Sequence, residues 1–172
     1  MMRIVIAVFA AGLASAGLTL TGPASAFPNG APWGSADPRN AQNCAACHFG
    51  DAAIQASEAV TMSGLPESVS AGGAYEIVLR FKRGSDGPSG FLVGASSGAF
   101  SADQSDLEVK GREIRSVSPN AAAAAEWTFN WAAPESLSGP VIFHIGVNAA
   151  NDDASPFGDE IHFRTIEVTA RE

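Results

Sequence analysis

The chain has 172 residues, of which 46% are hydrophobic and 16% charged, and its formal net charge at pH 7 is −8. That hydrophobic content is sufficient for a globular core, and the length fits a single domain once a leader is removed. The acidic balance excludes nucleic acid and anionic lipid as natural partners, because both are polyanions. It favours a partner protein that presents a basic docking face.

A secretory signal peptide is predicted at residues 1–26. Arg3 gives a basic start, residues 4–20 are apolar and rich in small side chains, and Ala24 and Ala26 form an A-x-A cleavage pattern. These features favour removal of the segment over its retention as a membrane helix. The mature chain would begin at Phe27 and contains no second apolar run long enough to span a membrane. We therefore expect an exported protein, periplasmic or extracellular.

Both cysteines of the chain lie in one motif, Cys44-Ala45-Ala46-Cys47-His48, which has the C-x-x-C-H spacing of c-type haem attachment. Two thiols at this spacing can each add to a haem vinyl group, and the adjacent imidazole can then reach the iron. A bare C-x-x-C also occurs in redox disulfides and zinc sites, but the sequence lacks the βαβ pattern of the former and the two further ligands of the latter. The motif predicts one covalent haem c on Cys44 and Cys47, with His48 as an iron ligand.

The second axial ligand of the iron is left open by the sequence, with nitrogen donors favoured. The α-amine of Phe27, which signal cleavage would free on a short arm ahead of the motif, ranks level with His144. The other possibilities are His162, Met62 and an empty position. Alternation along the predicted strands directs both His144 and His162 away from the core, and a hairpin would place them close to opposite each other.

Residues 57–172 are predicted to form an all-β domain, an immunoglobulin-like antiparallel β-sandwich, preceded by a haem-attachment segment at residues 27–56. Short β-prone stretches alternate with turn-forming runs such as 84–88 and 134–140. Seven strands at this spacing are typical of a sandwich, and we expect them at residues 59–65, 75–81, 91–95, 113–117, 126–131, 141–147 and 160–168. Period-two alternation predicts the core residues Tyr75, Ile77, Leu79, Phe81, Trp127, Phe129, Trp131, Val141, Phe143 and Ile145.

Several features occur in a characteristic order: a leader, Asn29-Gly30-Ala31-Pro32, the C-x-x-C-H-x-G motif, Trp127-x-x-x-Trp131-x-x-Pro134, and residues 147–151 followed by Gly158-Asp159. This layout resembles the bacterial reelin-type (Reeler-like) domains that carry a haem-attachment motif, and the resemblance covers nearly all of the mature chain. It implies an immunoglobulin-like sandwich, in a family whose members mostly have no assigned function. The chain departs from the family pattern at His144, where an aromatic residue is expected.

A weaker similarity is to the architecture of cytochrome f, which also carries a C-x-x-C-H motif on an immunoglobulin-like sandwich. In that protein the motif follows an aromatic-Pro mature N-terminus, and the free α-amine is the second axial ligand. Phe27-Pro28 would be the corresponding start here.

We expect a mono-haem c-type cytochrome that transfers electrons to a redox partner with a basic docking face, and not an enzyme. The alternative is a Reeler-like binding or small-ligand sensing module in which the haem has a structural or sensory role. The Asn- and Asp-rich residues 148–159 can also offer oxygen ligands to Ca²⁺, although a turn between two strands is the simpler interpretation.

Overall fold

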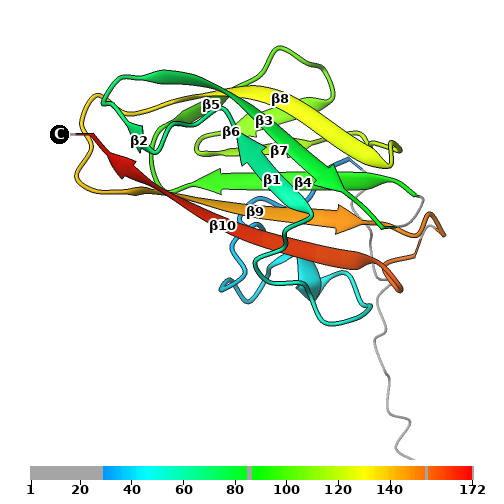
Figure 1. The fold of residues 1–172 in the computed structure, drawn as a ribbon. Helices are drawn as coiled ribbons and strands as arrows, with labels where there is room; N and C mark the ends of the chain where they lie inside the picture. The colour runs from blue at the N-terminus through cyan, green and yellow to red at the C-terminus, as the bar shows by residue number, and fades with distance from the viewer. Residues whose placement is uncertain (1–28, 85–86, 154, 172) are drawn as a thin grey trace, which may run out of the picture.

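Figure 1 shows the computed structural model of the chain, in which two β-sheets lie face to face. The structure describes residues 29–84, 87–153 and 155–171, so the predicted signal peptide and the α-amine of Phe27 lie outside the described residues. One short 3₁₀ helix covers Cys44–Ala46, and all the other regular elements of the described residues are strands. The prediction of an all-β sandwich is confirmed.

The two sheets have four and six strands. The smaller sheet contains, in spatial order, β1 (Val60–Ser63), β3 (Ala74–Lys82), β8 (Ala124–Ala132) and β5 (Ala99–Ser101). The larger sheet contains β2 (Ser68–Val69), β10 (Glu160–Ala170), β9 (Val141–Ala149), β4 (Ser89–Ala95), β7 (Glu113–Ser116) and β6 (Leu107–Lys110). All seven predicted strands are present, with ends that differ by a few residues.

The predicted number and direction of strands need two corrections. The short strands β2, β5 and β6 were not predicted. The two or three residues of β2 and β5 are too few to show an alternating pattern. In addition, β2 pairs in parallel with the end of β10, with Thr169 opposite Ser68, so the larger sheet is mixed rather than wholly antiparallel.

The core lies between the sheets and follows the predicted alternation. Trp127, Phe129 and Trp131 of β8 are buried against the inner residues of β3 and β9, and their aromatic rings contact those of neighbouring strands. The ten predicted core residues are confirmed, with Tyr75 half-buried at the edge, where its ring stacks on Trp131 at 5.9 Å between centroids.

The outer face of β9 and β10 is covered by residues 29–57, which we call the N-terminal layer (blue to cyan in Figure 1). Backbone hydrogen bonds join the layer to β10, from Ile54 N to the carbonyl of Ile161 and from Ser57 N to the carbonyl of Phe163. Cys44 fills the space above Gly146 of β9. The sandwich therefore has a third, irregular layer, and this layer contains the C-x-x-C-H motif.

The predicted orientation of His162 is wrong. His162 lies on the inner side of β10, where its ring and that of Phe81 form a T-shaped pair at 4.8 Å between centroids. Ile161 and Phe163 instead face outward, beneath the N-terminal layer. In the β9–β10 hairpin His162 is opposite Val147 and His144 is opposite Thr165, so the two imidazoles lie on different faces of the sheet.

The part of the chain that the structure describes contains no helix with the length and hydropathy of a membrane span.

Candidate functional site

The C-x-x-C-H motif is held in a tight turn by local hydrogen bonds. The side chain of Asn43 accepts a hydrogen bond from Ala45 N at 2.9 Å, which caps the 3₁₀ helix, and the Cys44 carbonyl accepts from the amides of Cys47 and His48. The Cys44 amide donates to the carbonyl of Ser35, so the turn is also joined to the start of the N-terminal layer. This turn buries Cys44 and leaves Cys47 exposed.

Cys44 is enclosed by Ile161 and Phe163, and its Sγ lies 3.4 Å from the carbonyl oxygen of Ser35. Burial raises the pKa of the Cys44 thiol to about 11, against a smaller opposing effect of the hydrogen bond to Ser35. Cys44 is therefore a protonated thiol at neutral pH. Redox cysteines depend on a thiolate, so this environment disfavours a thioredoxin-like role for the motif.

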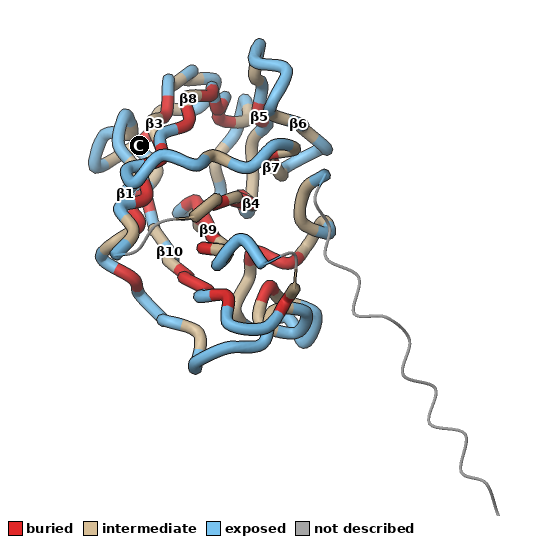
Figure 2. The backbone as a smooth tube through the Cα atoms, turned by 90° about the vertical axis from the view of Figure 1, so that its right-hand side faces the viewer, coloured by how far each residue is buried: buried red, intermediate tan, exposed pale blue. Residues whose placement is uncertain are grey.

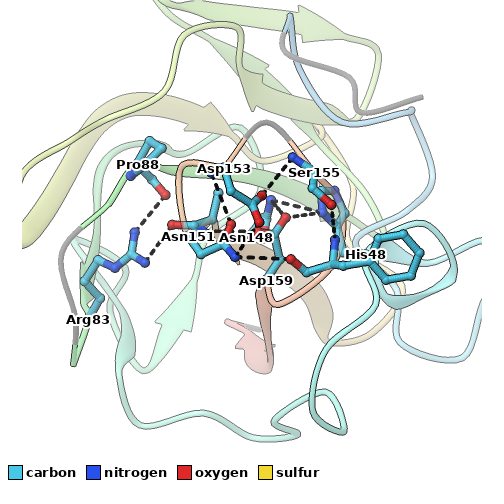
Figure 3. A network of polar contacts seen from close by, with 10 residues as sticks. His48, Arg83, Pro88, Asn148, Asn151, Asp153, Ser155 and Asp159 are labelled. Atoms are coloured by element: carbon cyan, nitrogen blue, oxygen red, sulfur yellow. Dashed lines mark hydrogen bonds and ion pairs between the residues drawn. The ribbon is translucent and has the colours of Figure 1, made fainter. Parts of the chain in front are cut away.

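His48 is held by a buried carboxylate from the other end of the chain. Its Nδ1 lies 2.6 Å from Oδ2 of Asp159, whose side chain is 2% exposed. Asn148 Nδ2 donates to the same oxygen, and the amide of Asn151 donates to Oδ1 of Asp159 (Figure 3). Because a carboxylate only accepts hydrogen bonds, Nδ1 of the ring donates in this contact, and in the neutral imidazole Nε2 then has the free lone pair. The imidazole is thus in the tautomer that can bind a metal ion through Nε2.

A pocket of about 280 Å³ lies beside this network, close to the lower end of the range for small-molecule sites, which begins at about 300 Å³. Both cysteines of the motif and His48 line the pocket together with Asp159. Its lining also includes Pro88, Gly90, Leu92 and Pro119. The structure thus brings the three predicted haem-attachment residues to one pocket with a partly apolar wall.

The structure does not bring His144 to this pocket. His144 lies in a separate polar groove, where its Nε2 accepts from the guanidinium of Arg39 at 3.0 Å and its Nδ1 lies 3.1 Å from Thr165 Oγ1. Burial lowers the pKa of His144, and the nearby carboxylate of Asp37 opposes this effect. Both ring nitrogens have protein partners, so this arrangement does not leave His144 free for iron.

The remaining predicted sixth ligands are also elsewhere. His162 Nδ1 lies 2.8 Å from Ser57 Oγ on the inner side of β10, and Met62 belongs to β1 of the smaller sheet, where it lies against the core. Phe27 is outside the described residues. Among the described residues that line the pocket, His48 is the only imidazole, and none is a methionine.

The loop between β9 and β10 uses its polar side chains for turns. Asp153 accepts from the amide of Ser155 at 2.9 Å, and Asn151 donates to the carbonyl of Phe157 at 3.2 Å. Within residues 29–84, 87–153 and 155–171, no three His, Cys, Asp or Glu side chains are arranged to hold a metal ion. The loop interpretation therefore fits the described contacts better than a Ca²⁺ site.

The role of Asp159 beside His48 was not predicted from the sequence. Its only sequence signal is an acidic residue after a glycine, where the loop enters β10, and 111 residues separate it from His48.

No known family model and no curated protein matches the chain. The structure is similar to the reeler domain of human F-spondin, with 14% sequence identity, a TM-score of 0.54, and coverage of 69% of this chain and 95% of that domain. It is also similar to the Reelin-N domain of F-spondin, with 16% identity, a TM-score of 0.56, and coverage of 75% and 96%. The fold is that of a reeler domain. The resemblance noted in the sequence is thus confirmed at the level of the fold.

Proposed function

We propose that the chain is an exported Reeler-like binding module that would carry one haem c, with Cys44 and Cys47 as the attachment residues and His48 as an iron ligand. The haem has a structural or sensory role in this proposal. The reeler-like fold gives no support to the electron-transfer role expected from the motif, and it agrees with the alternative of a binding module.

The proposal depends on one observation above all: both thiols and the imidazole of the motif line a single pocket. A second observation is the state of Asn148 in the pocket wall, since its buried Oδ1 has no hydrogen-bond partner among the described residues. A buried acceptor beside a pocket needs a partner from the pocket, which can be a bound group or an ordered water. The donor set, two thiols and one imidazole at C-x-x-C-H spacing, fits haem c.

Each residue has a defined part in this site. Cys44 and Cys47 anchor the group, one from inside the N-terminal layer and one from its surface. Asp159 acts as a positioning residue, because it fixes the ring of His48 and keeps the proton on Nδ1. Asn148 in turn fixes the carboxylate of Asp159. When bound, haem would supply an iron centre that can hold a small ligand or change oxidation state.

Attachment is tested by mass. We expect the protein exported from a host with the haem-attachment machinery to exceed the polypeptide mass by one haem and to keep the haem through acid-acetone extraction. The variant Cys44→Ala/Cys47→Ala is the control and should have the polypeptide mass alone. Purification of haem-free protein with a Cys44–Cys47 disulfide from its natural host would contradict the proposal.

The role of the haem is tested by its ligation. An absorption spectrum of five-coordinate iron that changes on addition of carbon monoxide supports the sensory role. A spectrum of six-coordinate iron that carbon monoxide does not change supports electron transfer. Asp159→Asn should shift the Soret band and the reduction potential, because a carboxylate raises the basicity of the imidazole more than an amide does. Asp153→Asn, on the exposed part of the same loop, is the matched control and should change neither.

A further inference from the structure

Two aromatic side chains lie exposed beside the His48–Asp159 pair. Phe49 directly follows His48 in the chain and is 44% exposed, and Phe157 lies two residues before Asp159 and is 60% exposed. Their ring centroids are 5.4 Å apart. Among the described residues, Ile54 is the one other large hydrophobic side chain with comparable exposure, at 38%. Single exposed apolar residues are ordinary, but two contacting rings form a small apolar surface with no intramolecular cover.

The backbone holds these two rings in place. Phe49 N donates to the carbonyl of Pro156 at 2.6 Å, and Gly158 N donates to the carbonyl of Phe49 at 2.7 Å. Gly50 approaches the backbone of Asp159 so closely that a Cβ there would collide with the carbonyl oxygen of Asp159. Two segments far apart in the sequence are therefore fixed against each other. Because their backbone is already ordered, binding of a partner at the two rings should have a low entropy cost.

The exposed charged side chains on the two segments that carry the aromatic pair are all acidic. Asp51 lies on the Phe49 segment and Asp152 and Asp153 on the Phe157 loop, and all three are exposed. The sequence contains no lysine or arginine at residues 40–79 or 116–163, the two stretches that supply this surface. The guanidinium of Arg83, which contacts the loop, donates to the carbonyls of Pro88 and Ala150 (Figure 3).

We propose that Phe49 and Phe157, with Asp51, Asp152 and Asp153 around them, form the docking surface for a protein partner that presents an apolar centre rimmed by lysine or arginine. An apolar centre with a charged rim is the ordinary anatomy of a transient protein interface, and aromatic residues are enriched at its centre. A second copy of this chain fits less well, since two acidic rims would face each other. This inference names the partner chemistry of the binding module proposed above, and it does not depend on haem attachment.

The test uses the exported protein, labelled with ¹⁵N, and two short synthetic peptides. One peptide has a Trp-Gly-Trp centre flanked by lysines, and the other has a Ser-Gly-Ser centre with the same lysines. We expect the aromatic peptide to shift the amide signals of residues 49–51, 152–153 and 157–158 most strongly. It should bind at least about tenfold more tightly than the serine peptide and lose affinity between roughly 0.05 and 0.3 M salt.

Two variants with matched controls separate the contributions of the rings and the charges. Phe49→Ser/Phe157→Ser should reduce the affinity of the aromatic peptide to that of the serine peptide, with an unchanged melting temperature that excludes misfolding. Asp51→Asn/Asp152→Asn/Asp153→Asn should weaken binding, whereas Glu76→Gln/Glu126→Gln/Glu135→Gln removes the same charge on and beside the smaller sheet and should not.

Several outcomes would overturn this inference. If the two peptides bound with equal affinity, the contact would be purely electrostatic. If the two charge variants lost the same affinity for the aromatic peptide, the electrostatic attraction would not be specific to this surface. Concentration-dependent shifts at Phe49 and Phe157 without peptide would assign the surface to a second copy. The mass of the same sample reports haem independently, so a missing haem and a missing docking surface are distinguishable.

Discussion

The interior of the sandwich and the N-terminal layer are built in different ways. Between the sheets, aromatic rings from several strands are fully buried and contact one another, as in Trp131 against Phe143 at 5.2 Å between centroids. The N-terminal layer is mostly exposed or half-buried (Figure 2). Its apolar contacts with the sandwich include a small cluster of Cys44, Ile161 and Phe163, and backbone hydrogen bonds join it to β10. Buried apolar area dominates folding stability, so the interior determines the fold. The layer contains Cys44, Cys47 and His48, and we expect it to be the less stable of the two regions because it buries less apolar area.

The largest expected effect is in the interior. Trp131→Ala should lower the free energy of unfolding by about 3–5 kcal/mol, because the indole is fully buried and its Nε1 donates to the carbonyl of Ser97. Trp33→Ala is the matched change in the N-terminal layer, where the indole is partly exposed and lies under the guanidinium of Arg115 at 4.2 Å. It should cost only about 0.5–1 kcal/mol. Chemical denaturation followed by circular dichroism measures both, and equal losses would remove the contrast between the regions.

An intermediate effect is expected where the layer meets the sheet. A Cβ on Gly146 would come within 2.9 Å of Cys44 Sγ and 3.4 Å of both Ala36 Cα and Phe163 Cε1. Gly146→Ala should therefore loosen residues 29–57 at a cost of about 1–3 kcal/mol, because overpacking forces neighbouring groups apart. Hydrogen exchange should rise at Cys44 and Ile54 while the amides of β3 and β8 stay protected.

Gly94→Ala is the control for that experiment, since a Cβ on Gly94 would meet the side chain of Glu113 at an ordinary 3.6 Å. Exchange in the layer should not change in this variant. If Gly146→Ala raised exchange throughout the sandwich, the layer and the interior would be one cooperative unit, and the comparison would fail.

The sequence predicted the interior well because strands with one buried face have period two. Strands β3, β8 and β9 all show it, and their inner residues were identified correctly. The same rule failed in β10, where Ile161, His162 and Phe163 are all buried, because the N-terminal layer covers the face that alternation assigns to solvent. A strand covered on both sides carries no signal for which side faces the core.

Only the C-x-x-C-H motif of the candidate site could be identified from the sequence. The spacing of Cys44, Cys47 and His48 is local, so it can be seen in the sequence. The contact of His48 with Asp159 depends on how the loop after β9 returns to the N-terminal layer, and no local pattern contains that information. The separation of His144 from the pocket follows from the same geometry, because Asn148 of β9 reaches the site and His144 lies four positions earlier on the strand.

The smallest expected effect is on the pH dependence of stability, and it comes from His162 at the boundary between the two regions. His162 lies on the inner side of β10, with Ser57 at its Nδ1, Glu160 3.4 Å from its Nε2, and Phe81 against its ring. Burial lowers the pKa of His162 below the ordinary value of 6.5, while Glu160 raises it and Arg83 adds to the lowering. The unfolded chain therefore binds a proton at a higher pH than the folded protein does.

This difference makes the folded protein lose stability as the pH falls below 6.5, while above that value His162 contributes no pH dependence. His162→Gln keeps a side chain that can hydrogen-bond to Ser57 but does not titrate, so the melting temperature should fall less steeply between about pH 6.5 and 5 than in the native protein. His144→Gln should reduce the slope less, because the His144 side chain is 17% exposed and that of His162 is 7% exposed. Thermal melts at closely spaced pH values measure both slopes. If the slope of His162→Gln matched that of the native protein, protonation of His162 would not limit acid stability.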